Sequence, residues 1–282
     1  MGRVLYGAPA VSELDKETEK RVRGLKAKGI VPCLAVLRVG EDAGALSYER
    51  GTLKCCNRVG IAVKKVVLPA DTAQEKLTET IEELNRDEKV HGVLILTPLP
   101  KSLDKEAACA ALAVKKDVDG VTAGAMAKVY SGTGEGFAPC TAEAVLEMLR
   151  FYQIALSGKK AAVIGRSLVV GRPTAMLLMQ ADATVTLCHS KTENTAEIVR
   201  EADIVVAAVG KAESLGKEYF RPGQIVIDVG TNWSESRQKL VGDVKYEEAA
   251  PLVMAVSPVP GGVGSITTSI LASHVVQAAE SN

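Results

Sequence analysis

The stretch Val163-Ile-Gly-Arg-Ser-Leu-Val-Val-Gly-Arg-Pro173 decides the fold of this chain. An apolar run from Ala161 to Ile164 leads into Gly165, which permits a tight turn, and Gly171 lets the following helix pack close to the strand. Strand, glycine turn and helix together present a helix N-terminus to an anion in doubly wound sheets. Ser167 occupies the place of the second glycine of the common G-x-G-x-x-G pattern, so an ordinary strand-to-helix turn is the alternative interpretation.

The composition excludes several classes of function. The 282 residues leave room for one large or two medium-sized domains. Lys plus Arg equals Asp plus Glu, at 34 each, so net charge provides no attraction to nucleic acid or an anionic membrane. The N-terminus shows no signal peptide, and apolar runs such as Ile204 to Val209 are far shorter than the roughly 20 residues that cross a membrane. We expect a cytoplasmic protein without nucleic-acid or membrane partners.

The six cysteines and three histidines are scattered along the chain, and no two cysteines form a C-x-x-C pair. The neighbours Cys55 and Cys56 point to different sides of any helix, which makes a poor metal site. We therefore expect reduced thiols, as in other cytosolic proteins, and no bound metal.

The first half of the chain alternates apolar runs of strand type with segments of helical spacing. Strands are expected at residues 32–39, 61–68 and 90–96, and helices at 12–28, 45–58, 72–85 and 103–114. Ser12 is the expected N-cap of the first helix. Residues 121–139, rich in glycine and small side chains, are interpreted as a connection. The alternation implies parallel strands joined by right-handed crossovers.

The second half repeats this alternation more regularly. Strands are expected at residues 160–164, 183–188, 204–209, 224–229 and 253–256, and helices at 142–152, 170–180, 195–202 and 266–280. The predicted fold is therefore α/β with two domains. Residues 1–140 plus 266–282 form the first domain, to which the last helix returns, and residues 141–265 form a Rossmann-like domain with a parallel sheet.

Ligands of α/β sheets bind beyond the carboxyl ends of the strands. Four such ends stand out: Gly165 to Ser167, His189 to Lys191, Gly210, and Asp228 to Gly230. An NAD site usually has an acid at the end of its second strand, whereas here that strand ends in His189-Ser190-Lys191. A hydroxyl and a cation suit a 2′-phosphate, which Arg166 could also bind with two hydrogen bonds. We predict NADP rather than NAD, with an incidentally basic, solvated loop as the alternative.

A second group of candidates lies in the first half. Tyr48 and Thr52 are four residues apart on a predicted helix and share a face, and Asp119 lies in a loop after the third strand and helix. By spacing alone, Tyr48 is more often a packed side chain with a solvated hydroxyl than a site residue. The segment Pro258 to Gly264 is either a rigid loop that lets the backbone approach a ligand or a plain linker.

Taken together, these stretches resemble the methylenetetrahydrofolate dehydrogenase/cyclohydrolase family over nearly the whole chain. The resemblance implies an N-terminal folate-binding domain, a nicotinamide-binding domain, an active cleft between them, and a homodimer. The matching segments are Val39-Gly-Glu-Asp42 with Tyr48, Pro98-Leu-Pro100, Lys116-Asp-Val-Asp-Gly120, Pro139-Cys-Thr141, Gly165-Arg-Ser167, Val170-Gly-Arg-Pro173, Asp228-Val-Gly230, Val241-Gly-Asp-Val244 and Pro258-Val-Pro-Gly-Gly-Val-Gly264.

The resemblance also assigns roles to residues, and it places Asp119 on the pteridine ring. Those expected at the reacting centre are Tyr48, Thr52 and Asp119. Those expected to bind substrate are Tyr48, Leu96, Asp119, Pro260, Gly261, Gly262 and Val263. Those expected to bind the cofactor are Gly165, Arg166, Ser167, Gly171, Ser190, Gly210 and Thr231, the last near the nicotinamide.

Two departures from the family pattern concern the cyclohydrolase reaction. In the family motif a lysine follows the tyrosine by four residues, and a glutamine before the Leu-Pro-Leu-Pro stretch supports that lysine. Here Thr52 and Leu96 stand at these positions. On a helix Thr52 lies about 40° from Tyr48. Lys54 lies about 240° and Arg50 about 200° from Tyr48, so neither basic residue is expected to replace the lysine.

The two family reactions make different demands on the protein. Hydride leaves a carbon whose two neighbouring nitrogens stabilise the cation, so the protein mainly aligns the reactants and excludes water. Hydrolysis needs proton transfer, typically worth about 10²–10⁴-fold, which neither Thr52 nor Leu96 can supply. We predict an NADP-dependent methylenetetrahydrofolate dehydrogenase with weak or absent cyclohydrolase activity, and a separate cyclohydrolase in the same cell. The alternatives are a fully bifunctional enzyme, a shikimate-type dehydrogenase, and a non-catalytic nucleotide-binding regulatory module.

Overall fold

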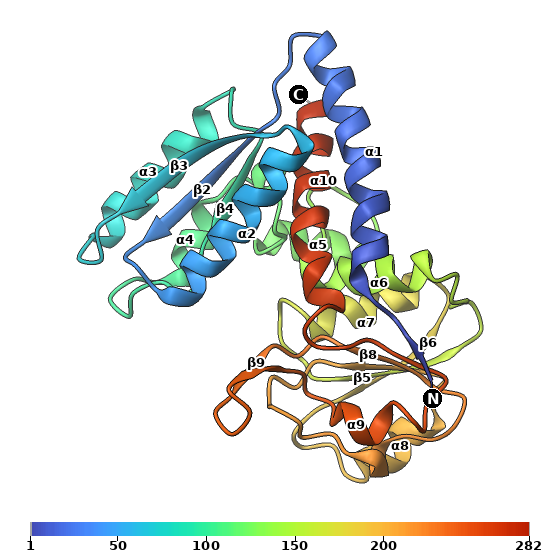
Figure 1. The fold of residues 1–282 in the computed structure, drawn as a ribbon. Helices are drawn as coiled ribbons and strands as arrows, with labels where there is room; N and C mark the ends of the chain where they lie inside the picture. The colour runs from blue at the N-terminus through green and yellow to red at the C-terminus, as the bar shows by residue number, and fades with distance from the viewer. Residues whose placement is uncertain (1, 282) are drawn as a thin grey trace. The chain divides into compact units, whose positions relative to one another are not determined.

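The computed structural model describes residues 2–281, which divide into two compact units, each with its own parallel sheet (Figure 1). The three-strand unit comprises Glu13–Cys140 and residues 268–281, and the six-strand unit comprises residues 2–12 and Thr141–Thr267. None of the helices within residues 2–281 has both the length and the apolar character needed to cross a membrane. The α/β class predicted from the alternation is confirmed.

The sheet of the three-strand unit has the order β3-β2-β4, and its strands are parallel. The central strand β2 (Cys33–Val39) pairs with β3 (Ala62–Leu68) on one side and β4 (Gly92–Ile95) on the other. Nearly all of β2 and all of β4 are buried, which explains why both are apolar apart from Arg38. The other elements are most of α1 (Gly7–Ala27), α2 (Ala43–Val59), α3 (Gln74–Arg86), α4 (Lys105–Ala111), η1 (Val114–Lys116), α5 (Ala123–Ser131) and most of α10 (Thr267–Glu280).

The helices α2 and α3 cover opposite faces of this sheet, as right-handed crossovers to either side of a central strand require (Figure 1). Leu77, Ile81 and Leu84 recur along one face of α3 and are buried in one core cluster with Leu37 and Val93 of the sheet. Burial of each such side chain contributes on the order of 1.5–3 kcal/mol. This packing fixes the sheet edge from which the candidate residues of the unit extend.

The six-strand unit contains one parallel sheet with the order β1-β11-β8-β7-β5-β6. Its strands are β1 (Arg3–Val4), β5 (Lys160–Ile164), β6 (Thr184–Cys188), β7 (Ile204–Ala207), β8 (Ile225–Asp228) and β11 (Ala255–Val256), and β9 (Asn232–Ser234) with β10 (Lys239–Val241) forms a separate antiparallel hairpin. Its helices are α6 (Cys140–Phe151), α7 (Gly171–Gln180), α8 (Thr195–Glu201) and α9 (Tyr246–Ala249), with the 3₁₀ turns η2 (Lys217–Tyr219) and η3 (Val263–Ser265).

The strand order reverses at β5, because α7 leads outward to β6 and α8 leads back past β5 to β7. Accordingly, α7 and α8 lie on opposite faces of the sheet (Figure 1). A reversal of this kind opens a crevice beyond the carboxyl ends of the two central strands, where doubly wound proteins bind ligands. The glycine turn that follows β5 begins at this position, so the predicted Rossmann-like fold is confirmed.

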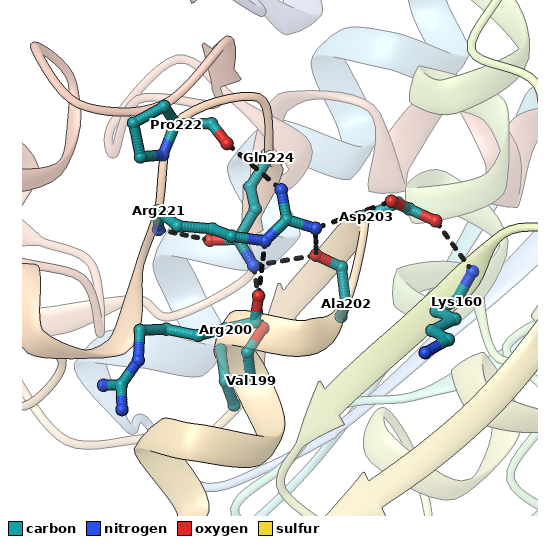
Figure 2. A network of polar contacts seen from close by, with 8 residues as sticks. All are labelled: Lys160, Val199, Arg200, Ala202, Asp203, Arg221, Pro222 and Gln224. Atoms are coloured by element: carbon teal, nitrogen blue, oxygen red, sulfur yellow. Dashed lines mark hydrogen bonds and ion pairs between the residues drawn. The ribbon is translucent and has the colours of Figure 1, made fainter.

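The opposite edge of the same sheet is held by a polar network (Figure 2). Gln224 Nε2 donates to the Ala202 carbonyl at 2.9 Å, just after α8. The Arg221 guanidinium donates to the same carbonyl at 3.1 Å and lies 3.6 Å from Asp203. The Asp203 carboxylate in turn accepts the Lys160 backbone N–H at 3.1 Å. These bonds satisfy the carbonyls at a helix end and connect the starts of β5, β7 and β8, so the network is structural.

Two segments differ from the prediction. The first helix begins at Gly7 rather than at Ser12, since Pro9 is tolerated in a first helical turn, where its missing N–H costs no hydrogen bond. Residues 121–139 are not a plain connection, because they contain α5, which Thr122 caps and Gly132 ends with φ +75°. The alanines of this stretch are good helix formers, but the stretch lacks an apolar periodicity long enough to recognise.

The division into units also differs from the predicted domains at the N-terminus. Residues 2–12, which were assigned to the first domain, belong to the six-strand unit. The cause is β1, whose Arg3 and Val4 pair in parallel with Ala255 and Val256 of β11. The other boundaries lie after Cys140 and after Thr267, where α10 enters the three-strand unit.

Candidate active site and nucleotide site

Tyr48 and Thr52 lie one turn apart on α2, in the three-strand unit. The helix is defined at both ends, since Asp42 Oδ1 accepts the Ala45 N–H at 2.9 Å and Gly60 ends the helix with φ +83°. Tyr48 is half-buried, whereas Thr52 is only 1% exposed. Among the described residues, no group forms a hydrogen bond with Thr52 Oγ1. A buried hydroxyl in this state is unusual, and it lies at the position where the resemblance leads us to expect a lysine.

The charged network beside Tyr48 was not anticipated from the sequence. Glu49 is buried and accepts from Arg38 Nε at 2.8 Å and lies 2.9 Å from Lys65 Nζ. Burial acts to raise the pKa of Glu49, but the hydrogen bonds from Lys65 and Arg38 outweigh it and hold this pKa below its usual range. The guanidinium of Arg38 also donates to the Gly40 carbonyl. The network therefore fastens α2 to β2 at the turn that carries Tyr48.

Leu96 follows β4 directly and is 2% exposed, with its backbone N–H bonded to the Leu37 carbonyl at 2.9 Å. Lys54 and Arg50 are exposed, while Thr52 is buried on the same uninterrupted helix. The helix is regular, so neither basic side chain shares the buried face of Thr52. The register of α2 therefore puts neither Lys54 nor Arg50 in the place of Thr52, and the departures at positions 52 and 96 stay predictions from the resemblance.

Asp119 follows η1 in the segment Lys116-Asp-Val-Asp-Gly120. The other polar members of this segment serve the backbone. Asp117 accepts the N–H groups of Val121 and Thr122, and Lys116 Nζ donates to one carbonyl in the last turn of α3 and to one just after it. Asp119 as a residue is half-buried, but its carboxyl lies deep among protein atoms, and burial raises its pKa to about 6. Asp119 is thus the acid of the segment that is suited to a ligand.

The glycine turn after β5 fits a phosphate group. Gly165 has φ +124°, and a Cβ there would lie 2.0 Å from the Ala208 carbonyl oxygen. A Cβ at Gly171 would lie 2.0 Å from the Gly165 carbonyl oxygen. Ser167 Oγ accepts the Gly171 N–H at 3.3 Å and so supports the first turn of α7. Only glycine fits at both positions, and the turn brings exposed backbone to the helix N-terminus, where an anion is favoured.

Arg166 and Ser190 extend from neighbouring strands of the six-strand unit. In the parallel pairing of β5 with β6, Ile164 lies opposite Cys188, and Arg166 and Ser190 each come two residues later. Both side chains are exposed. The turn after β6 is fixed internally, because the His189 backbone N–H donates to Thr192 Oγ1 at 2.9 Å. The structure therefore brings these two predicted cofactor residues to the same sheet edge.

The N–H groups around Gly210 bond to the protein itself rather than facing a ligand. The Asp243 carboxylate accepts the backbone N–H groups of Val209, Gly210 and Lys211, at 2.5, 2.9 and 2.9 Å. It also accepts from Asn232 Nδ2 at 2.9 Å. In the predicted cofactor site, Gly210 could therefore contact a ligand only through its carbonyl oxygen and its exposed Cα. Thr231 is exposed, next to this network.

A second buried acid, Asp228, organises the neighbouring loop. Its carboxylate accepts the N–H groups of Gly230, Asp243 and Val244 at 2.9, 3.0 and 2.9 Å. Burial raises the pKa of Asp228 to about 7, against the opposing effect of these three hydrogen bonds. A Cβ at Gly242 would lie 1.9 Å from Asp228 Oδ2. The motifs Asp228-Val-Gly230 and Val241-Gly-Asp-Val244 are separate segments of the sequence. These hydrogen bonds join them into one buried structure.

The proline- and glycine-rich loop belongs to the six-strand unit. The Gly7 N–H donates to the Gly261 carbonyl at 2.8 Å, and Ser265 Oγ donates to the Gly262 carbonyl at 2.7 Å. Pro260 and Gly261 are exposed, whereas Gly262 and Val263 are buried. The loop is packed on the start of α1 and is not a plain linker. The substrate candidates are therefore divided between the two units, and the predicted cleft between the units stays a prediction.

Fold and site together define an α/β protein that combines a Rossmann-like dinucleotide unit with a second parallel-sheet unit. Residues 5–119 match the tetrahydrofolate dehydrogenase/cyclohydrolase catalytic domain, and residues 139–282 match the NAD(P)-binding domain of the same family. The chain belongs to the tetrahydrofolate dehydrogenase/cyclohydrolase family. This membership confirms the resemblance drawn from the motifs and excludes the shikimate-type alternative.

Individual relatives agree over the full length. The chain is 45% identical to the bifunctional protein FolD of Carboxydothermus hydrogenoformans, over 99% of this chain and 98% of the relative. It is similar to the crystal structure of the bifunctional FolD of Campylobacter jejuni, with TM-score 0.96, 37% identity and coverage of 100% and 99%. A Trypanosoma brucei FolD structure, complexed with NADP and an inhibitor, has TM-score 0.92, 34% identity and coverage of 99% and 98%.

Proposed function

We propose that this protein is an NADP-dependent dehydrogenase that oxidises 5,10-methylenetetrahydrofolate to 5,10-methenyltetrahydrofolate. The observation that carries the proposal is the pairing of a glycine turn, in which side chains are sterically excluded at Gly165 and Gly171, with a hydroxyl and a guanidinium at adjacent strand ends. Membership in the family supplies the folate half of the reaction.

Residues of the six-strand unit fit NADP. The glycine turn and the N-terminus of α7 would hold the pyrophosphate, and Arg166 and Ser190 would hold the 2′-phosphate. When bound, NADP accepts the hydride. The Trypanosoma relative, whose structure contains NADP, supports the choice of this nucleotide.

Residues of the three-strand unit would hold the folate. Tyr48 on α2 and Asp119 beyond η1 offer a hydroxyl and a carboxyl for the pteridine. No protein group has to exchange a proton in the hydride transfer, because the substrate nitrogens stabilise the cation that forms. The work of the chain is to align the two carbons and to exclude water.

A second candidate function is hydrolysis of the methenyl cation to 10-formyltetrahydrofolate. The names of the Carboxydothermus and Campylobacter relatives, both bifunctional, favour a protein with both activities. Thr52 and Leu96 argue against hydrolysis, because neither side chain exchanges a proton at neutral pH. Our hypothesis of weak or absent hydrolysis concerns these two positions. If it is correct, a separate cyclohydrolase serves the same cell.

One comparison on a single preparation tests the proposal. Reduction of NADP and of NAD is followed with methylenetetrahydrofolate, and decay of methenyltetrahydrofolate is followed with and without protein. We expect folate-dependent reduction that is faster with NADP than with NAD. Absence of that reduction would refute the dehydrogenase, and enzyme-dependent hydrolysis well above the buffer rate would refute the weak-hydrolysis hypothesis and favour the bifunctional alternative.

The predicted homodimer and cytoplasmic location come from the family resemblance and the composition. Light scattering of the purified protein at several concentrations tests the first of them. A mass of twice 29.7 kDa is expected, and the mass of one chain at all concentrations would contradict the dimer.

A further inference from the structure

Three segments of the three-strand unit converge on the loop that carries Asp119. They are the loop itself, residues 118–120, the segment 137–140 before α6, and α10 near the C-terminus. The contacts join positions up to 156 residues apart in sequence. No side chain in the second and third segments has a role in the function proposed above.

His274, on α10, holds the backbone of this loop. Its ring is 3% exposed, and Nδ1 lies 2.8 Å from the Val118 carbonyl oxygen, which makes Nδ1–H the donor. The ring stacks on Phe137, with centroids 4.7 Å apart and an interplanar angle of 27°. A buried ring fixed by a stack and a hydrogen bond has one orientation, so it constrains the carbonyl that immediately precedes Asp119.

Cys140 contacts the same loop from the start of α6. It is 2% exposed, and Sγ lies 3.3 Å from the Val118 carbonyl oxygen. Its thiol also forms a hydrogen bond with the Asp119 carboxyl, which lowers the pKa of that carboxyl against the larger effect of burial. A thiol has one proton. When it is donated to Asp119, the Val118 carbonyl keeps its bond from His274, so the two residues satisfy the loop jointly.

Gly120 restricts the same loop directly after Asp119. It has φ +68°, and a Cβ there would lie 2.5 Å from the Pro139 nitrogen. The loop is therefore pressed against the backbone of residues 137–140 directly after Asp119. With a hydrogen bond before the acid and a close backbone contact after it, the acid has little freedom to turn.

We infer that Cys140 and His274 are positioning residues for Asp119: His274 fixes the Val118 carbonyl, and Cys140 orients the Asp119 carboxylate toward the pteridine. The inference rests on the proposed function, because Asp119 meets a pteridine only if the chain binds a folate.

The groups that shift the pKa of Asp119 determine which measurable change follows when the Cys140 thiol is removed. After burial, the hydrogen bond from Cys140 is the largest influence on the Asp119 pKa. Asp117 raises that pKa, whereas His274 and Lys105 lower it. Removal of the thiol leaves burial and Asp117 in place, so the pKa of Asp119 rises above about 6. A serine keeps a donor at nearly the same place.

The experiment compares Cys140→Ala with Cys140→Ser, and His274→Leu with His274→Asn, whose amide N–H can replace Nδ1–H. KM for methylenetetrahydrofolate, KM for NADP and the pH dependence of kcat/KM are measured for each. Cys140→Ala is expected to raise the folate KM about tenfold, leave the NADP KM unchanged, and move the acidic limb of the profile to higher pH. Cys140→Ser and His274→Asn are expected to restore most of the wild-type behaviour.

Cys33→Ala is the matched control, since Cys33 is half-buried at the start of β2 in the same unit. A Cys140→Ala protein with wild-type folate KM and pH profile would overturn the inference, as would equal increases in both KM values. The carboxyl pKa of Asp119, measured by carbon NMR and assigned with Asp119→Asn, does not depend on activity. An unchanged pKa in Cys140→Ala therefore overturns the inference even if the proposed dehydrogenase reaction is absent.

Discussion

Thr52 has a buried hydroxyl to which no other described residue forms a hydrogen bond, at the position where the family resemblance leads us to expect a lysine. A threonine hydroxyl is not a proton-transfer group at neutral pH. Leu96 stands where the resemblance expects the supporting glutamine, whereas Tyr48 and Asp119 match the expected motif. At the scale of single residues, the two positions where the resemblance expects proton-transfer chemistry hold a hydroxyl and an aliphatic side chain.

Introducing the expected lysine at position 52 and the expected glutamine at position 96 should increase hydrolysis in two steps. Thr52→Lys alone is expected to recover little, because Leu96 leaves the new ammonium without its supporting amide. The double variant Thr52→Lys with Leu96→Gln is expected to gain about 10²–10⁴-fold in methenyltetrahydrofolate hydrolysis. The assay follows loss of the methenyl absorbance, with Lys54→Ala as the exposed control. Full recovery from Thr52→Lys alone would show that Leu96 has no part.

Arg166 and Ser190 are expected to set the preference for NADP. Arg166→Gln removes a charge-assisted hydrogen bond to the 2′-phosphate, which corresponds to an increase of about 10- to 100-fold in the NADP KM. The NAD KM should change little, since NAD has no phosphate there. Ser190→Ala should act in the same direction with a smaller effect. Steady-state kinetics with both nucleotides measures the change, and equal losses for NADP and NAD would contradict the assignment.

At the scale of elements, two aspartates and two glycines shape the nucleotide edge of the six-strand unit. Asp243 gathers three consecutive N–H groups after β7, and Asp228 gathers three around the loop after β8. Gly165 and Gly171 let β5 and α7 approach each other. The edge is built from backbone. Its shape depends on the two glycines, where no side chain fits, and on the two aspartates, whose carboxylates accept the backbone N–H groups.

Gly171→Ala tests this close approach. The new Cβ would meet the Gly165 carbonyl, so we expect a loss of about 1–3 kcal/mol in the free energy of unfolding and weaker NADP binding. Gly24→Ala is the matched control, because its Cβ would enter open space in the middle of α1. That change should stabilise the protein by about 0.5–1 kcal/mol. Urea unfolding measures both, and a neutral Gly171→Ala would show that the turn can relax.

At the scale of the whole molecule, the raised pKa of Asp228 links stability to pH. Burial lifts this pKa to about 7, from an ordinary value of 3.8, so between these values the folded protein binds more protons than the unfolded chain. The contribution of Asp228 to stability is therefore full below about pH 4 and is lost as the pH rises toward 7, by at most about 1.4 kcal/mol per pH unit. Asp119, whose pKa is also raised, acts in the same direction.

Asp228→Asn isolates this contribution. Its amide keeps an oxygen for two of the three N–H groups but turns a donor toward Val244, so the variant is less stable at low pH. The difference between wild type and variant should shrink as the pH rises from 5 to 8, measured by urea unfolding at several pH values. A difference that is independent of pH would show that Asp228 does not titrate in this range.

Much of the fold follows from local patterns. The strand at residues 160–164 was predicted to the residue, because a buried parallel strand leaves a continuous apolar run in the sequence. The helix at Ala123–Ser131 was missed, and the N-terminal segment was assigned to the wrong unit. Its two-residue strand β1 is defined by pairing with β11, a partner about 250 residues away, which no local period can reveal.

The sequence by itself determined the α/β class, the family and the glycine turn. Each of these is carried by residue type and spacing within a short segment. The tertiary structure alone decided that Asp243 occupies the N–H groups at Gly210, that Arg38 and Glu49 fasten α2 beside Tyr48, and that His274 and Cys140 meet at the loop of Asp119. The physical reason is that a buried charge or donor acquires its role from the partner that satisfies it, and the chain brings that partner close only when it folds.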